Sequence, residues 1–323
     1  MRGSSGALDS AELIERIRIL SEQVWENRVK LPDIEQWLNN FTGKVVGVQN
    51  ERANALHLLA HFNYFGVEEI RILLRCVYRD LFRYPLIQEI RRSLGNTRDT
   101  AQVHARFKIE LAATRFVGMG TPAASGTHLL YYFRQENSLP ETHFIEQAQL
   151  GKFKDGTFRS DPALSGVHRL VFLDDVLGSG QQLGRYAGTT LQQIKATAAA
   201  NAHTIDLNYF VLFAKAEGLA FARSVNSGFD RVEAVHELDP SEKAFEADSR
   251  VFASAQPPVI QAEARQVAEH YGSLVFPGHP LGYRGGQLLL GLHHNVPDNT
   301  LPIFWYDEDG TLWNPIFPRH PKV

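Results

Sequence analysis

Residues 169–183 read RLVFLDDVLGSGQQL, and this stretch decides the fold class. The apolar run 170–173 is typical of a strand buried on both faces of a parallel sheet. Two glycines, Gly178 and Gly180, then indicate a tight turn, and a helical pattern follows from about Gln181. The stretch therefore predicts a strand, a turn and a helix, which is the unit that α/β folds repeat.

Further strands and helices alternate around this unit. We expect strands at 114–120, 143–150, 206–214 and 231–238, and helices at 125–134, 178–200 and 217–226. Strands alternating with helices predict an α/β fold with a doubly wound, mostly parallel sheet and right-handed crossovers.

The two ends of the chain have different patterns. Helices are expected at about 9–24, 50–64, 67–83, 86–93 and 99–113, and two strands near the C-terminus at 287–294 and 300–306. In the third helix Ile70, Leu74, Val77 and Leu81 form an apolar stripe, and Pro85 is expected to end it. We therefore expect a helical N-terminal domain at 1–105 and an α/β domain at 106–323, with a C-terminal cap at 272–323.

Composition narrows the class of protein. The 323 residues are 44% hydrophobic and 21% charged, as in soluble globular proteins. No apolar run approaches the ~20 residues of a membrane span, and the start lacks the layout of a secretory signal. The single cysteine, Cys76, excludes an intramolecular disulfide and a cysteine-based zinc site. A cytoplasmic protein with no membrane partner is expected.

Two adjacent carboxylates, Asp174 and Asp175, follow the apolar run. Ligands of open α/β sheets bind at the carboxyl ends of the strands. A carboxylate pair there can accept hydrogen bonds from the 2′- and 3′-hydroxyls of a ribose. The alternative is an ordinary turn whose aspartates cap the helix, but both lie too far before the helix to be its N-cap. We predict that both are catalytic residues.

The turn after these aspartates suits a phosphate group. Backbone N–H groups at a helix start favour a dianion, and glycine lets the backbone approach it closely. The predicted phosphate-binding residues are Gly178, Ser179, Gly180, Gln181 and Gln182.

Polar and aromatic residues crowd the C-terminal segment between prolines. Asn and His could read the edge of a base while Tyr or Trp stacks on it. This predicted base pocket contains Tyr283, His293, Asn295, Asn299 and Trp305. The alternative assigns the same residues to turns and to the core, where Asn and His commonly serve.

Charge is spread unevenly along the chain. Residues 1–115 carry 17 Lys and Arg against 14 Asp and Glu, a net charge of +3. Because the whole chain has a net charge of −3, residues 116–323 carry −6. Four arginines, Arg71, Arg75, Arg79 and Arg83, follow one another at four-residue spacing on one predicted helix. This row is either a solvated face or a docking strip for an acidic chain or a nucleic-acid backbone.

The segment DDVLGSGQQL resembles the phosphoribosyl diphosphate (PRPP) signature of type I phosphoribosyltransferases. That signature is an apolar strand, Asp-Asp or Asp-Glu, two spacers and Thr-Thr-Gly-x-Thr. Here Gly178, Ser179 and Gln182 stand at the threonine positions. The missing last hydroxyl removes one phosphate contact that the signature implies.

Two more segments gain a role from this resemblance. Segment 116–126 lies where such enzymes place a pyrophosphate loop, which would use Gly120, Thr121 and Ser125; a simple turn is the alternative. The stretch GKFKDGTFR would be a mobile loop whose Lys152, Lys154 and Arg159 meet the pyrophosphate; a solvated loop is the alternative.

The likeness extends to WLNNF at 37–41 and to HPLGYRGGQLLLGLHHNVPDNTLPIFW at 279–305. With the segment around the aspartates, they resemble the phosphoribosyltransferase-like PRTase-CE family of prokaryotic conflict systems. The resemblance implies a role in an antiviral defence cassette, with a protein or ribonucleoprotein partner such as a retron.

These observations predict a Mg²⁺-dependent enzyme that acts at the anomeric carbon of a ribose 5-phosphate, by transfer from PRPP or by cleaving or rebuilding a nucleotide glycosidic bond. Two other classes stay open. One is a sensor that binds nucleotide or PRPP without turnover and controls a partner, since a fold does not imply catalysis. The other is a nucleic-acid-binding scaffold, which only the N-terminal arginines support.

Overall fold

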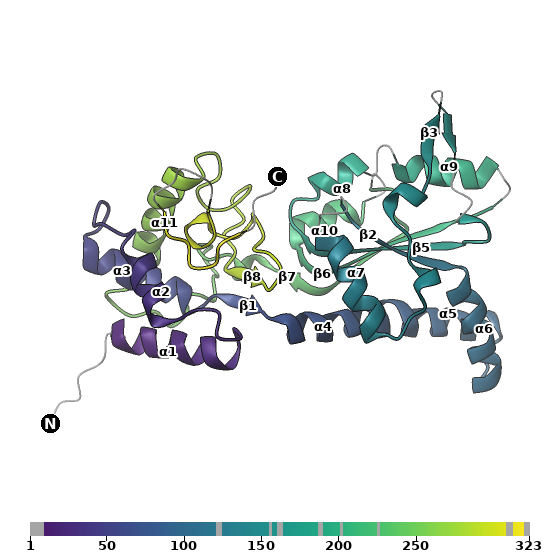
Figure 1. Ribbon diagram of the computed structural model, residues 1–323, viewed down its shortest axis with the longest axis horizontal. Coiled ribbons are helices and arrows are strands. Elements are labelled where there is room, and N and C mark those ends of the chain that lie inside the picture. Colours follow the sequence, from purple (N-terminus) through teal and green to yellow (C-terminus); the bar gives the residue numbers. More distant parts are fainter. Residues whose placement is uncertain are drawn as a thin grey trace. The chain divides into compact units, whose positions relative to one another are not determined.

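The structure is a computed structural model that describes residues 10–120, 125–154, 157–159, 164–186, 190–200, 203–224, 227–307 and 313–319. The chain divides into two compact units. Unit 2 is the continuous segment Arg71–Leu238, whereas unit 1 combines the residues up to Ile70 with those from Asp239 onward. In Figure 1 the purple N-terminal helices and the yellow-green C-terminal segments accordingly gather in one unit.

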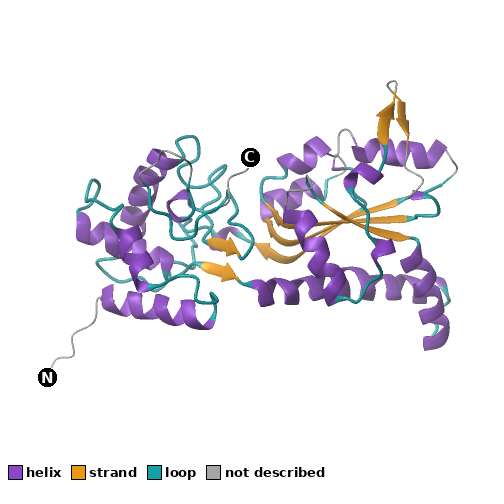
Figure 2. Cartoon of the chain, viewed as in Figure 1, coloured by secondary structure: helices purple, strands orange, loops and turns teal. Residues whose placement is uncertain are grey.

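Unit 2 is built on a four-stranded sheet. Its strands are β2 (Thr114–Gly118), β5 (Arg169–Leu177), β6 (Asp206–Lys215) and β7 (Arg231–Leu238), all parallel and in the order β2-β5-β6-β7. The apolar run of β5 is buried throughout, as expected for a strand covered on both faces. Figure 2 shows helices on both sides of these strands. The predicted α/β class with a parallel sheet is confirmed.

The strand predicted at 143–150 does not form. The segment contains two short 3₁₀ turns, Glu141–His143 and Gln147–Gln149, and a single parallel bridge joins Phe144 to Phe116 of β2. This bridge marks the other edge of β2, because β5 lies on its opposite side. The chain therefore leaves β2, touches one side of it and returns on the other as β5. The carboxyl ends of β2 and β5 thus lie at a topological switch point, where such sheets bind ligands.

Aromatic side chains hold one helical layer to the sheet. This layer contains α4 (Val67–Cys76), a π-helix (Val77–Arg83) and α7 (Ser125–Glu136). Phe116 of β2 contacts Phe82 and Phe133, with ring centroids 5.2 and 5.0 Å away. The opposite face packs on α8 (Gln181–Tyr186), α9 (Gln192–Ala200) and α10 (Ala216–Ala222).

The predicted helix at 67–83 has a π-helical second half. A π-helix adds a residue to each turn, so the position below Val77 is Phe82, which is 3% exposed, and not the predicted Leu81. Pro85 does not end the helix, because it falls in the first turn of α5 (Tyr84–Ser93), where proline is tolerated.

Residues 71–105, predicted to belong to the N-terminal domain, pack instead with the sheet. Arg169 at the start of β5 pairs with Asp206 of β6 at 2.8 Å. The same guanidinium lies 3.8 Å from Glu89 of α5 and 3.8 Å from Glu110 of α6 (Thr100–Ala112). These charges tie two N-terminal helices to unit 2.

Unit 1 unites both ends of the chain. Its elements are α1 (Ser10–Gln23), α2 (Leu31–Leu38), α3 (Val48–Leu59), β1 (Asn63–Phe65), a 3₁₀ turn (Pro240–Glu242), α11 (Gln261–Val275), β8 (Leu290–Leu292) and a 3₁₀ turn (Pro302–Phe304). β1 pairs with β8 in parallel. Trp37 is fully buried, stacks on Phe304 at 5.4 Å and donates its indole N–H to the Ile303 carbonyl at 2.8 Å. The predicted N-terminal domain and C-terminal cap therefore share one core, and the strand predicted at 300–306 is a 3₁₀ turn.

Candidate functional site

The aspartate pair lies near the carboxyl end of β5, at the switch point. Asp174 is half-buried and Asp175 is 8% exposed. One oxygen of Asp174, Oδ1, accepts the Asp175 N–H at 3.0 Å, and the other accepts the Tyr209 hydroxyl of β6 at 2.8 Å. Asp175 Oδ1 accepts the Val176 N–H at 2.7 Å. The strand continues to Leu177, so both carboxylates project from the sheet itself and are held by its backbone.

Burial and mutual repulsion shape the electrostatics of the pair. Burial first, and then the charge of Asp175, raise the pKa of Asp174 well above its ordinary value. The Tyr209 hydroxyl and the Asp175 N–H oppose this shift in the pKa of Asp174 only in part. The site therefore favours a proton, a hydroxyl donor or a cation beside Asp174.

The glycine turn after β5 rests directly on α10. Gly180 has a left-handed φ of +75°, and a Cβ there would lie 2.7 Å from Cδ1 of Phe221. A Cβ on Gly218 of α10 would lie 2.2 Å from the Gly178 carbonyl oxygen. These close approaches leave the predicted phosphate turn little freedom to move. Ser179 is half-buried in this turn, and Gln181 and Gln182 begin α8, where the side chain of Gln182 is outside the described part.

The predicted pyrophosphate loop lies beside the aspartates. The Met119 N–H donates to the Leu173 carbonyl at 2.8 Å, one residue before Asp174. Gly120 has a φ of +100°, and a Cβ on Gly126 would lie 2.4 Å from the Met119 carbonyl oxygen. The fold thus brings both predicted loops to the carboxyl ends of the adjacent strands β2 and β5. Thr121 and the Ser125 side chain lie outside the described residues.

The stretch predicted as a loop around 151–161 contains an antiparallel hairpin. Its strands are β3 (Lys152–Lys154) and β4 (Thr157–Arg159), with Lys152 opposite Arg159. β4 packs near α9, on the same side of the sheet as the glycine turn. The predicted pyrophosphate contacts are Lys152, Lys154 and Arg159, and their side chains lie outside the described part of the chain.

The predicted base-pocket residues all lie in unit 1, whereas the aspartates belong to unit 2. Trp305 is 5% exposed and donates its indole N–H to Thr300. Asn299 donates to the Tyr283 carbonyl, and Asn295 accepts the Val296 N–H. Tyr283 packs on His279, and His293 packs on His294. These contacts tie Trp305, Asn299 and Asn295 to the backbone of unit 1, and the base pocket itself stays a prediction.

The four arginines of the row differ in their partners and in their exposure. Arg71 pairs with Glu136 at 2.9 Å, and the Arg83 guanidinium lies 5.7 Å from the Phe107 ring centroid. Arg75 is 3.8 Å from Glu136, and Arg79 pairs with its neighbour Asp80 at 2.7 Å. Both central arginines have more than half of the side chain exposed.

Those two arginines also line a shallow groove of about 370 Å³. Its other lining residues are Ile72, Cys76 and Asn137.

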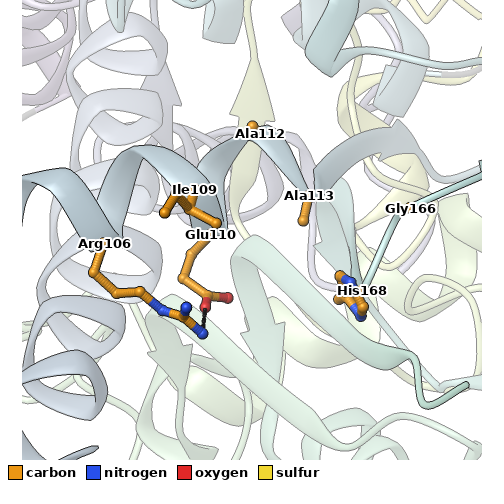
Figure 3. Close-up of a pocket in the computed structure, with 7 residues that line it drawn as sticks. All are labelled: Arg106, Ile109, Glu110, Ala112, Ala113, Gly166 and His168. Carbon is orange, nitrogen blue, oxygen red and sulfur yellow. Dashed lines mark ion pairs between the residues drawn. The ribbon is translucent and has the colours of Figure 1, made fainter. Parts of the chain in front are cut away.

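A larger open pocket of about 570 Å³ lies at the other end of the sheet (Figure 3). Ala113 and His168, which line it, precede β2 and β5, so the pocket faces away from the carboxyl ends. Arg106 and Glu110 form a 2.8 Å ion pair on its wall. A ligand bound at the switch point would therefore not occupy this pocket.

The aspartate pair suits Mg²⁺ held mainly by water and pyrophosphate. Carboxylate oxygens are the hard donors that Mg²⁺ prefers, and Mg²⁺ commonly keeps several waters. Among the described residues no group of three or more His, Cys, Asp or Glu side chains could hold a metal by itself.

Sequence reasoning missed three residues of this site. Tyr209 reads as one more aromatic residue of a buried strand, and only the pairing of Phe172 with Tyr209 across β5 and β6 brings its hydroxyl to Asp174. Gly126 and Gly218 sit inside helices, where an isolated glycine often indicates close packing.

A parallel sheet with an aspartate pair and a glycine turn at its switch point defines a type I phosphoribosyltransferase-like fold. The PRTase-CE family model matches residues 34–319, and the chain belongs to this family, as the motifs predicted. The crystal structure of orotate phosphoribosyltransferase from Aeropyrum pernix is similar at 20% identity, over 46% of this chain and 76% of that chain, with a TM-score of 0.23. No curated protein matches the chain. In the part of the chain that the structure describes, no helix has the length and apolar character to cross a membrane.

Proposed function

We propose that this protein is a Mg²⁺-dependent enzyme that acts at the anomeric carbon of a ribose 5-phosphate, in PRPP or in a nucleotide. The observation that carries the proposal is the pair Asp174 and Asp175, fixed by backbone N–H groups at the switch point between two loops. Membership of a phosphoribosyltransferase-like family supports the same substrate class.

The two aspartates would bind and orient the sugar. Their oxygens would accept hydrogen bonds from the 2′- and 3′-hydroxyls, while the turn at Gly178–Gly180 would donate N–H groups to the 5-phosphate. Breaking the bond at the anomeric carbon gives an oxocarbenium-like transition state. The negative charge of Asp174 and Asp175 would offset the positive charge that develops there.

The β2–α7 loop at Gly120 and the hairpin at Lys152–Arg159 would bind the pyrophosphate and exclude water. Bound Mg²⁺ would neutralise part of the pyrophosphate charge, held through water by the aspartates. No described residue is assigned as the general base.

Comparing nucleotide pools tests this function. Mass spectrometry of cells that express the wild type or Asp174→Asn should show a nucleotide or base that changes only with the wild type. Identical pools, with both proteins folded and equally abundant, would contradict the enzyme proposal.

The second candidate is a non-catalytic sensor of PRPP or nucleotide within a defence complex. The departures from the PRPP signature favour it, since Gly178 and Gln182 replace two threonines. Ligand binding without turnover, together with a ligand-dependent change in a partner's activity, would distinguish this candidate from the enzyme.

We propose that the protein works in the cytoplasm, in an antiviral defence cassette of the retron-associated kind. Arg75 and Arg79 would dock its protein or ribonucleoprotein partner. Their exposed guanidinium groups and the groove between them support this assignment.

A further inference from the structure

Tyr209 places a hydroxyl group in an otherwise apolar layer. The residue is 1% exposed, and its ring stacks on Phe229 at 5.3 Å, which in turn contacts Phe172 at 5.4 Å. Its neighbour Phe210 and nearby Phe213 on β6 are also buried, so packing alone would be served by phenylalanine. A hydroxyl in such a layer costs free energy unless it is hydrogen-bonded. Its partner here is Oδ2 of Asp174, at 2.8 Å.

This hydrogen bond fixes the carboxylate plane of Asp174. Oδ2 accepts the Tyr209 hydroxyl while Oδ1 accepts the Asp175 N–H, so rotation of the carboxylate would break both bonds. A carboxylate has about four lone-pair sites, so each oxygen keeps acceptor capacity for a ligand.

We infer that Tyr209 is a positioning residue that acts through Asp174 and makes the site selective for a ribose over a 2-deoxyribose phosphate. The inference rests on the proposed function, because it assumes that Asp174 binds the sugar diol. Without the Tyr209 hydroxyl, the Asp174 carboxylate would lose one of the two hydrogen bonds that fix its plane, and the 2-hydroxyl would lose a well-aligned acceptor.

Titration calorimetry with two probes, ribose 5-phosphate and 2-deoxyribose 5-phosphate, tests the inference on the full chain. A hydrogen bond to a charged group is worth roughly a tenfold change in affinity or more, so the wild type should prefer ribose 5-phosphate by about that factor. Tyr209→Phe should bring the two affinities within roughly threefold of each other by weakening only the ribose compound.

Tyr271→Phe is the matched control. Tyr271 is also buried and donates to a carboxylate, Glu51 at 2.7 Å, but in unit 1. This variant loses an equivalent hydrogen bond and should keep the wild-type preference.

A double-mutant cycle adds a second criterion. If Tyr209 acts through Asp174, Tyr209→Phe should change the preference in the wild type and leave it unchanged in Asp174→Asn. A folded Tyr209→Phe that keeps the wild-type preference, or an equal effect in both backgrounds, would overturn the inference. A wild type that binds neither sugar phosphate would instead refute the proposed function itself.

Discussion

Gly218→Ala is the sharpest test of how the glycine turn is held. Gly218 lies in α10, and the Cβ of alanine would stand 2.2 Å from the Gly178 carbonyl oxygen. Contacts of a Cβ closer than 3.0 Å essentially do not occur, so the two groups must separate by at least about 0.8 Å. The atom in the way is backbone, and the movement therefore passes to the turn at 178–180.

The expected effect follows from the hydrogen bonds that this turn would make. Each bond to a charged phosphate is worth about 1.5–3 kcal/mol, which is roughly ten- to a hundredfold in affinity. A displacement of nearly 1 Å should remove at least one such bond. We expect Gly218→Ala to weaken Mg²⁺-PRPP binding at least about tenfold while the protein stays folded.

Calorimetry measures the affinity, and circular dichroism checks the fold. Ala220→Ser, at an exposed position of the same helix, is the control and should bind like the wild type. A folded Gly218→Ala variant with wild-type affinity would refute the reasoning, because the turn would then tolerate displacement.

The remaining predictions concern the other parts of the chain. Trp37→Ala should lower the free energy of unfolding of unit 1 by about 3–5 kcal/mol, measured by denaturant titration, and an unchanged midpoint would argue against a core shared by both chain ends. Turnover, if the enzyme proposal holds, should stop in EDTA and in a variant lacking residues 152–159; full activity in either assay would exclude this mechanism. Substituting both Arg75 and Arg79 by Glu should abolish co-elution with the partner and leave the affinity for PRPP unchanged. Normal complex formation on size-exclusion chromatography would show that the two arginines form a solvated face and do not dock the partner.

The central strand, turn and aspartate pair could be predicted because their signals are local. Four apolar residues in a row are typical of a strand covered on both faces, and the glycines at 178 and 180 indicate the turn that follows. Ligands of parallel sheets bind at the carboxyl ends of the strands, so Asp174 and Asp175 could be predicted as candidate site residues without knowledge of the remaining fold.

Contacts between distant segments could not be predicted in this way. Trp37 bonds to Ile303 across 266 residues, and no periodicity in either segment specifies the other. The contact between Tyr209 and Asp174 could not be predicted for the same reason, because it depends on the register between β5 and β6. The base pocket was predicted from residue types alone, and residue types do not reveal that Asn299 donates to the Tyr283 carbonyl, 16 residues away.

Two local features carried signals that were open to a different interpretation. The pair Asp155-Gly156 is favoured in tight hairpins, and it separates the two segments that form β3 and β4. Pro302 lacks the N–H that a strand needs, and its segment forms a 3₁₀ turn.

The most direct test of the central claim is the affinity of the purified protein for PRPP with Mg²⁺, compared between the wild type and Asp175→Asn. The claim is that the aspartate pair binds a ribose phosphate, and the Asp175 carboxylate accepts the Val176 N–H of its own strand at 2.7 Å. We predict that the wild type binds and that Asp175→Asn, still folded, binds at least about tenfold more weakly, since a hydrogen bond to a charged group is lost. Equal affinity of the two folded proteins, or no binding by the wild type, would contradict the account.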